Sequence, residues 1–303
     1  MNSTPRILND PRQNRLLAAL SDAEVERLLP ALEPVHWRTG QVLSESGAPF
    51  THVYFPTTAI VSLLYVTQDG GSTEVAVVGN DGVVGVTLFM GGNVTPSQTV
   101  VQTSGYGFRM REEAVRAEID RAGPTLHMML RYAQAMIAQV AQTAMCNRYH
   151  SIDQQLARRL LLALDRSPSD DLVMTQEALA HLLGVRREGV TAAALKLQSA
   201  GVIRYSRGHI AVLDRSRLEH HSCECYRVVR KEYDRLLPAL PLRTTAAPEP
   251  VSGGAESSNE MPFKSRPPDA AIRLARVIAP VFDGLAHWNA RSHQRGVDAV
   301  ALA

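Results

Sequence analysis

The sequence predicts an α+β fold, in which a β-roll or jelly-roll domain is followed by a long helix and a second, smaller domain. Three observations support this prediction. Short apolar or alternating runs separated by turn residues fill the chain from residue 35 to about residue 110. Longer runs with helical spacing begin after Gly123-Pro124. Beyond Leu237 the chain is rich in Pro, Ser, Gly and Ala, a composition that cannot build a core and predicts disorder.

Composition narrows the class of protein. A chain of 303 residues can hold two domains of ordinary size, or one domain and a tail. Its 45% hydrophobic content is typical of a globular protein, and no apolar run reaches the roughly 20 residues that span a bilayer. The N-terminus has no apolar stretch of the signal-peptide type, so we expect a cytoplasmic protein. With 32 Lys and Arg against 30 Asp and Glu, nucleic-acid affinity would need local clustering of positive charge.

The first predicted domain spans residues 14–122 and is mostly β structure. Two short helices should open it within residues 14–33, with Ser21-Asp22 placed to cap the second. The β part should be a barrel or jelly-roll, because many short strands joined by tight turns fold in this way. The glycines of GVVGV and FMGGN are interpreted as turns or bulges among strands. The predicted strand runs are HVYFP, AIVSLLYV, TEVAVV, GVVGVTLFM, QTVVQT and GYGFRM.

Residues 123–147 are predicted to form one helix that packs along a second copy of itself. Apolar residues recur there at steps of four and three, which is the repeat of helices that pack side by side. Small or flexible residues at this seam suit close packing between two equivalent helices, and we therefore predict a homodimer. The alternative is a long helix lying on its own barrel. The residues of the predicted seam are Leu126, Leu130, Ala133, Ile137, Val140 and Ala144.

Residues 148–237 are predicted to form the second domain. An amphipathic helix should open it and end at RSPSDD. A shorter helix should begin after Thr175, whose hydroxyl can accept a hydrogen bond from a backbone N–H, and should end at Gly184. After that sharp turn, a second helix runs from about Arg186 to Ser199. This is the pattern of a helix-turn-helix.

A predicted hairpin follows the two helices. The run VIRYSRGHIAVLD gives two short strands around Ser206-Arg207-Gly208, a tight turn with a basic tip. Two helices and such a wing make a winged helix-turn-helix. Between Thr175 and Arg217 basic residues outnumber acidic ones, so the local charge is positive although the total charge is nearly balanced.

A domain of this kind binds double-stranded DNA by placing the start of its second helix in the major groove. Arginine can bond guanine there and glutamate can accept from cytosine, whereas Arg207 and the Thr175 end suit phosphates. The structural alternative is a solvated helix start. The predicted DNA-binding residues are Thr175, Gln176, Arg186, Arg187, Glu188, Thr191, Lys196 and Arg207.

The order of a β-rich domain, a long helix and a winged helix resembles the Crp/Fnr family of bacterial transcription regulators, over roughly residues 15–237. The most specific part is MTQEALAHLLGVRREGVTAAALKLQSAGVIRYSRGHIAVLD. The resemblance implies a cyclic-nucleotide-binding-like domain, contacts with RNA polymerase, and a reading helix whose arginine and glutamate match Arg187 and Glu188. A further arginine common in the family falls at Ala192, which is a departure from the family pattern.

The β domain departs further from that pattern. Cyclic-nucleotide binders of the family use an acidic residue for the ribose and an arginine for the cyclic phosphate, and the matching places fall near Val86 and near Pro96-Ser97. No residue from 82 through 108 carries a charge. A bound phosphate would therefore lack charge-assisted hydrogen bonds that contribute about 1.5 to 3 kcal/mol each. We predict that cyclic AMP does not bind in the family's manner.

No cofactor or metal is predicted, and the effector is left open. The oxygen-sensing branch of the family holds an iron–sulfur cluster with N-terminal cysteines, and none here precedes Cys146. Three cysteines are too few for a four-cysteine cluster. Cys223 and Cys225 lie near His220-His221, but they lack the usual C-x₂-C spacing. In a strand-like segment, their side chains would also point to opposite faces.

The leading hypothesis is a dimeric, DNA-binding transcription regulator that reads an inverted repeat with half-sites about one helical turn apart. The alternative is a small-ligand or redox sensor whose winged helix docks on a protein partner. An enzyme is disfavoured because no nucleophile–base pairing, phosphate-binding glycine loop or carboxylate pair stands in a motif context. The tail over residues 238–303 includes a potential helix, AAIRLARVIAPVFDGLAHW, to which we assign no function.

Overall fold

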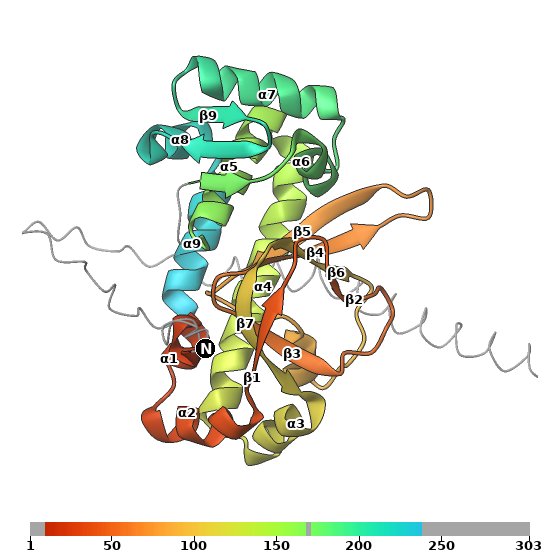
Figure 1. Ribbon diagram of the computed structural model, residues 1–303, viewed down its shortest axis with the longest axis vertical. Helices are drawn as coiled ribbons and strands as arrows, with labels where there is room; N and C mark the ends of the chain where they lie inside the picture. Colours follow the sequence, from red (N-terminus) through yellow and green to blue (C-terminus); the bar gives the residue numbers. More distant parts are fainter. Residues whose placement is uncertain (1–9, 168–170, 238–303) are drawn as a thin grey trace, which may run out of the picture. The chain divides into compact units, whose positions relative to one another are not determined.

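A computed structural model describes residues 10–167 and 171–237 (Figure 1). The predicted tail over residues 238–303 and its potential helix lie outside the described residues. Within the described part, the predicted order is confirmed: a β domain, then a long helix, then a winged helix-turn-helix. No helix of this part is both long enough and apolar enough to cross a membrane.

The N-terminal segment forms the short helices that the spacing predicted. Ser21 caps the second of them in a reciprocal arrangement: the Glu24 backbone N–H donates to the Ser21 hydroxyl, and the Ser21 N–H donates to the Glu24 carboxylate over 3.0 Å. The elements are η2 (Pro11–Gln13), α1 (Arg15–Ala18), α2 (Asp22–Leu28) and η3 (Leu29–Ala31).

Two antiparallel sheets form the β-roll, with strand orders β1-β7-β3 and β2-β6-β4-β5. Trp37, Phe55 and Phe108 are buried in its core. Gly107 is required beside Trp37, because a β-carbon at Gly107 would lie 2.4 Å from the indole ring. The strands are β1 (Glu33–Trp37), β2 (Val42–Ser44), β3 (His52–Pro56), β4 (Ile60–Val66), β5 (Ser72–Val78), β6 (Gln98–Thr103) and β7 (Gly105–Arg111).

One predicted strand is wrong. The run GVVGVTLFM forms a 3₁₀ helix, η4 (Val86–Met90), preceded by a single isolated bridge between Val84 and Tyr54. Gly85 and Gly91 flank η4 with φ values of +83° and +88°, and this left-handed backbone at both ends interrupts the extended pairing that a strand needs. The interpretation of these glycines as turn residues is confirmed.

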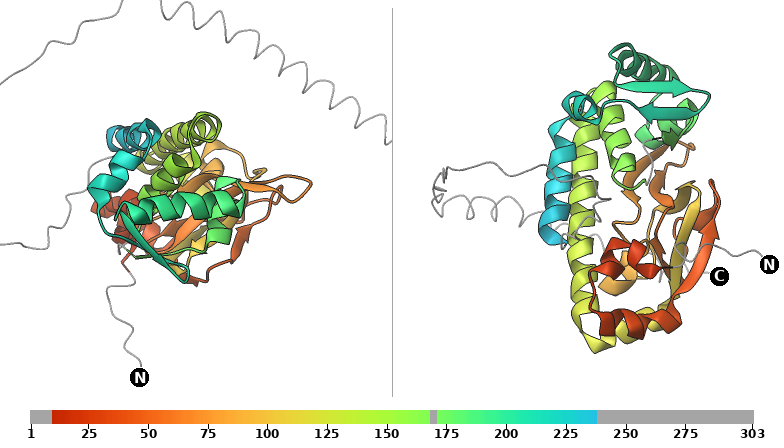
Figure 2. Two further views of the ribbon diagram at one scale, coloured as in Figure 1. Left: turned by 90° about the horizontal axis from the view of Figure 1, so that it is seen from above. Right: turned by 60° about the vertical axis from the view of Figure 1, so that its left-hand side comes forward.

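The long helix α4 (Pro124–Tyr149) packs against β5 and η4, and the last described helix, α9 (Glu224–Leu236), runs alongside it (Figure 2). Gln139 of α4 donates a hydrogen bond to the Val77 carbonyl over 3.2 Å, which fixes the helix to the sheet. The shorter helix α3 (Glu112–Arg121) precedes α4. The predicted helix is confirmed, and so is the alternative in which it packs on its own barrel, whereas its pairing with a second copy stays a prediction.

The C-terminal domain begins with α5 (Ile152–Leu164), which Ser151 caps. A strand that the sequence did not predict, β8, completes a small sheet with the order β8-β10-β9. The segment around Cys223 is not strand-like, because Cys223 caps α9 and Cys225 lies in its first turn. The remaining elements are β8 (Asp171–Val173), α6 (Gln176–Leu183), α7 (Arg187–Ser199), β9 (Ile203–Ser206), β10 (His209–Val212) and α8 (Arg215–His221).

Candidate nucleic-acid interface

Helices α6 and α7 are held in a fixed relation by their caps and their shared core. The Thr175 hydroxyl accepts a hydrogen bond from the Ala178 N–H over 3.1 Å, which starts α6. Gly184 ends α6 with a φ of +65°, a backbone conformation that favours glycine. Leu179 and Val190, both fully buried, pack the two helices together. The start of α7 is therefore presented on a rigid support.

Arg186, Arg187 and Glu188 are exposed at the start of α7. The Arg187 guanidinium lies 3.8 Å from the Glu177 carboxylate, and each of these side chains is 64% exposed. An ion pair this open to water contributes at most about 1 kcal/mol, so Arg187 can exchange Glu177 for another partner at little cost. Of the residues predicted to read bases, both Arg187 and Glu188 face solvent.

A polar contact connects the starts of the two helices. The Thr191 hydroxyl lies 2.8 Å from Gln176 Oε1 and 3.0 Å from the Arg187 carbonyl oxygen. The side chains of Gln176 and Thr191 are half-buried. They therefore form part of the surface at the start of α7 and also hold one edge of it in place. The structure thus brings Gln176, Arg187 and Thr191 together, as the predicted interface requires.

The wing is a hairpin with a two-residue turn. Arg207 and Gly208 have φ values of +50° and +81°, the two left-handed residues of a type I′ turn. The Gly208 carbonyl accepts a hydrogen bond from the Met174 N–H over 2.8 Å. Since Met174 directly precedes Thr175, the basic tip and the N-terminal cap of α6 lie at the same edge of the domain. Tyr205 anchors the wing to α7 through a 2.9 Å hydrogen bond from its N–H to Gln198.

Lys196 is separate from this group. It lies near the end of α7 and forms a 2.7 Å ion pair with Asp153, in the first turn of α5. On a helix, nine positions of about 100° each place Lys196 on the face opposite Arg187. The structure therefore brings seven of the eight predicted residues to one part of the domain. The DNA contact assigned to Lys196 stays a prediction.

Sequence reasoning missed the polar attachment of this domain to the β-roll. Arg159 of α5 forms a buried ion pair of 2.6 Å with Glu74 of β5, and Arg166 forms one of 2.8 Å with Asp81. Gln102 of β6 also contacts Arg159. The only signal in the sequence is the pair Arg158-Arg159, which interrupts an otherwise apolar run in α5. The partner of Arg159 is 85 positions away, beyond the reach of local patterns.

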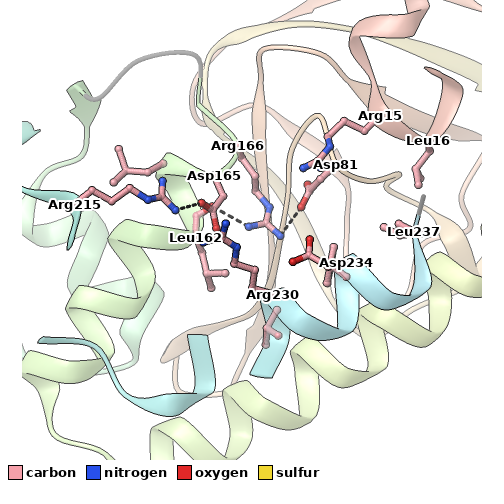
Figure 3. Close-up of a pocket in the computed structure, with 13 residues that line it drawn as sticks. Arg15, Leu16, Asp81, Leu162, Asp165, Arg166, Arg215, Arg230, Asp234 and Leu237 are labelled. Atoms are coloured by element: carbon pink, nitrogen blue, oxygen red, sulfur yellow. Dashed lines mark hydrogen bonds and ion pairs between the residues drawn. The ribbon is translucent and has the colours of Figure 1, made fainter. Parts of the chain in front are cut away.

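A cavity of about 480 Å³ lies at this junction (Figure 3). Its wall carries both signs of charge, and two ion pairs are already formed within it: Arg166 with Asp81, and Arg215 with Asp165 over 2.5 Å. Burial raises the pKa of Tyr226, whose hydroxyl lies 3.0 Å from Asp165, to about 12. Arg15, Arg230 and Asp234 line the cavity as well, so its wall is a mixed-charge polar contact between elements.

A β-roll joined through a long helix to a winged helix-turn-helix, with two arginines exposed at the start of α7, defines a DNA-binding transcription regulator. Comparison with known proteins agrees with this class. Residues 34–122 match the cyclic nucleotide-binding domain family, and residues 154–221 match the Crp-like helix-turn-helix domain family. The chain therefore belongs to the Crp/Fnr family of transcription regulators, and it is a DNA-binding regulator rather than an enzyme.

Solved structures support the fold. A Crp/Fnr-family transcriptional regulator from Eubacterium rectale is 18% identical, with a TM-score of 0.54 over 69% of this chain and 98% of that chain. FixK2 from Bradyrhizobium japonicum is 15% identical, with a TM-score of 0.54 over 63% and 98%. A Crp/Fnr-family regulator from Thermus thermophilus is 21% identical, with a TM-score of 0.50 over 63% and 98%. No curated protein sequence matches the chain at a significant level.

Proposed function

We propose that this regulator acts as a homodimer that reads an inverted repeat with the start of α7. Arg187 and Glu188 would contact base edges in the major groove, where arginine bonds guanine and glutamate accepts from cytosine. Arg186, Thr175 and Arg207 would bind phosphates on either side. The observation that carries the proposal is the exposed start of α7, held rigidly between the cap of α6 and the wing.

The proposed dimer uses the face of α4 that its own subunit leaves uncovered. Leu130, Ile137 and Val140 are 43%, 60% and 37% exposed, although they are apolar. Such a row at a seven-residue repeat is the surface that a second α4 would cover. Leu126 is half-buried, and Ala133, also assigned to the seam, is buried within its own subunit at 5% exposure. We therefore centre the seam on Leu130, Ile137, Val140 and Ala144.

For the β-roll, we propose a sensor role without cyclic AMP as the effector. The positions that match the family's ribose-binding acid and phosphate-binding arginine lie near Val86, at the start of η4, and near Ser97. Ser97 is buried, and its hydroxyl already pairs with Thr95 over 2.9 Å. Isothermal titration with cyclic AMP should therefore give no binding heat. A cyclic-AMP-dependent gain in DNA affinity would contradict this proposal.

The DNA-reading proposal is tested by measuring binding to genomic fragments and to random DNA at two salt concentrations. We expect salt-dependent binding to both and a preference for particular fragments. Arg187→Ala should cost about 1 to 3 kcal/mol on the preferred fragment and little on random DNA. An equal loss on both DNAs would demote Arg187 to a phosphate contact. Salt-independent binding without sequence preference would overturn the whole reading surface.

A matched control is Arg116→Ala, which removes an arginine of similar exposure from α3, far from the winged helix in sequence. Its DNA affinity should equal that of the parent protein.

The partner and the location are proposals that rest on the family's role: RNA polymerase is the proposed partner, and the cytoplasm is the proposed location. If instead the protein is retained weakly on DNA and forms a stable complex with a protein partner, the docking alternative is favoured.

A further inference from the structure

All three cysteines of the chain meet at one place, together with His150. Cys146 Sγ lies 3.5 Å from Cys223 Sγ, and Cys225 Sγ lies 3.5 Å from His150 Nδ1. The four potential ligand atoms all lie within 4.8 Å of one another. The three thiols are at most 3% exposed and form a cluster of their own, apart from the main hydrophobic core. Three buried thiols and one imidazole so close together form a potential metal-binding group.

Local structure accounts for this convergence. Cys146 lies in the last turn of α4, and His150 is the C-cap residue, whose N–H donates to the Cys146 carbonyl, so both residues stand at the end of the helix. Ser222 ends α8, and Cys223 then caps α9, which places Cys225 in the first helical turn. Because α9 packs along α4, the beginning of one helix faces the end of the other. Two pairs of ligands thus come from segments 77 positions apart.

We propose that Cys146, His150, Cys223 and Cys225 bind a single zinc ion. Three thiolates and one imidazole are a standard donor set for structural, four-coordinate zinc. Zinc–sulfur bonds of about 2.3 Å place two sulfurs of a tetrahedron about 3.8 Å apart. The 3.5 Å contact between Cys146 and Cys223 is close to that value. A four-iron cluster attaches each ligand to a different iron atom, so its ligands lie farther apart than they do here.

The surroundings of the four ligands also fit a metal ion. His150 Nε2 lies 3.3 Å from the Glu224 carboxylate, so the proton belongs on Nε2 and the Nδ1 lone pair faces Cys225. A carboxylate behind a histidine ligand is the usual second contact of zinc sites. Three thiolates and Zn²⁺ leave one net negative charge. The buried guanidinium of Arg158 lies near enough to Cys146 and Cys225 to compensate this charge, and its Nε has no hydrogen-bond partner among the described residues.

The position of the site gives it a structural consequence. The ion would join the end of α4 to the start of α9. The end of α4 directly precedes Ser151, where α5 and the DNA-binding domain begin. Zinc would therefore fix the connection between the proposed dimer helix and the reading domain. Removing it should loosen α9 from α4 and lower the melting temperature of the whole protein.

The direct test is the zinc content of the full chain, purified under reducing conditions without added metal. We expect about one zinc per chain by mass spectrometry of the metals. Cys146→Ser and Cys225→Ser should each abolish high-affinity binding. His221→Ala is the matched control, since His221 lies two positions from Cys223 yet is exposed and outside the cluster, and it should retain the zinc. Zinc that is absent and cannot be added back, or that remains in the cysteine variants, would overturn the site.

Two further measurements keep the test valid if a cysteine variant fails to fold. Glu224→Gln changes a side chain that is 64% exposed, so it should fold normally and weaken zinc binding by about 10 to 100-fold. Cobalt(II) should replace the zinc and give the sulfur-to-metal charge-transfer bands of a tetrahedral thiolate site. An octahedral cobalt spectrum, or unchanged zinc affinity in Glu224→Gln, would contradict the proposed geometry.

Thiol reactivity distinguishes the remaining outcomes, because the chain has no cysteine outside this cluster. The thiols of the zinc-loaded protein should react slowly with a disulfide reagent, and chelation should expose all three. A purified protein that holds iron and sulfide instead of zinc would replace the proposal with a cluster. A protein with only one reactive thiol after denaturation, and no metal, would indicate a Cys146–Cys223 disulfide and would also overturn it.

Discussion

Arg159 and Glu74 form the most buried ion pair between the reading domain and the β-roll, with side chains 2% and 6% exposed. Ser62 also donates a hydrogen bond to the Glu74 carboxylate over 2.5 Å. Glu74→Ala would leave the guanidinium buried without its countercharge, because Gln102, its other hydrogen-bond partner in the described part of the chain, is neutral. We expect a loss of about 3 to 5 kcal/mol in the free energy of unfolding, measured by urea denaturation.

The matching control removes both charges. In the double variant Glu74→Leu with Arg159→Met, no buried charge is left unpaired, and the stability should return to near that of the parent protein. If Glu74→Ala alone costs less than about 1 kcal/mol, water must reach Arg159, and the pair cannot act as a fixed attachment between the two domains.

A second ion pair makes stability depend on pH. Both oxygens of the Glu118 carboxylate accept hydrogen bonds from Arg27 at 3.0 Å, and these bonds hold the pKa of Glu118 below its ordinary value. A lowered folded-state pKa stabilises the protein above the unfolded pKa of about 4.3, and this contribution is lost as the pH falls through the folded pKa. Glu118→Gln should therefore lower stability at neutral pH.

The pH profile is measured by urea denaturation between neutral and acidic pH. The difference in unfolding free energy between the parent protein and Glu118→Gln should shrink toward zero in acid. In an Arg27→Gln background the same substitution should have a smaller effect, because only the more exposed ion pair of Glu118 with Arg121, over 3.5 Å, is left. A constant difference across the range would show that Glu118 acts through its shape and packing rather than through its charge.

At the scale of elements, the wing turn combines two opposing requirements at Arg207. A φ of +50° is unfavourable for arginine, whereas a type I′ turn favours asparagine or glycine. Arg207→Asn should therefore stabilise the protein, by about 1 kcal/mol at most. The same change should weaken binding to every DNA sequence. It should also reduce the slope of the logarithm of DNA affinity against the logarithm of salt concentration by about 1 per subunit. If stability and DNA affinity change in the same direction, and the slope of DNA affinity against salt concentration stays the same, a phosphate contact by Arg207 is excluded.

Most elements could be predicted because their signals are local. The caps at Ser21 and Thr175, the left-handed Gly184 and the turn at Gly208 are written in neighbouring residues, and all four are confirmed. The predicted strand over GVVGVTLFM failed because apolar composition alone does not distinguish a buried strand from a buried 3₁₀ turn. Two glycines with positive φ decided that local structure.

The metal-ligating cluster was beyond local reasoning. A strand would place the side chains of Cys223 and Cys225 on opposite faces. In the structure, Cys223 is the N-cap residue of α9 and Cys225 lies in its first turn, so both side chains lie near the end of α4. His220 and His221 are adjacent in sequence but are not part of the cluster, and His150, which is, stands 73 positions before Cys223. Only the packing of α9 on α4 brings these residues together, and a contact of that kind leaves no periodic signal in a single sequence.

At the scale of the whole molecule, the proposed dimer depends on the face of α4 that its own subunit leaves uncovered. Ile137 is 60% exposed within one subunit, so Ile137→Glu should cost the isolated fold little. Across a two-fold seam, however, it would bring two carboxylates into an apolar contact. We expect sedimentation velocity to show a shift from dimer to monomer over a range of protein concentrations, with unchanged circular dichroism.

The same variant tests whether dimerisation serves DNA reading. Two linked reading helices bind both half-sites of an inverted repeat at once, which raises the affinity above that of a single helix. A monomeric Ile137→Glu variant should therefore lose most of its preference for the full repeat over a half-site. Val228→Glu is the matched control: Val228 is an exposed apolar residue of α9, 39% exposed, and it lies outside the predicted seam. Its assembly and its binding to the full repeat should match those of the parent protein. If Ile137→Glu stays dimeric and only Val228→Glu dissociates, the subunits meet through α9, and the two reading helices must be spaced by a different symmetry axis.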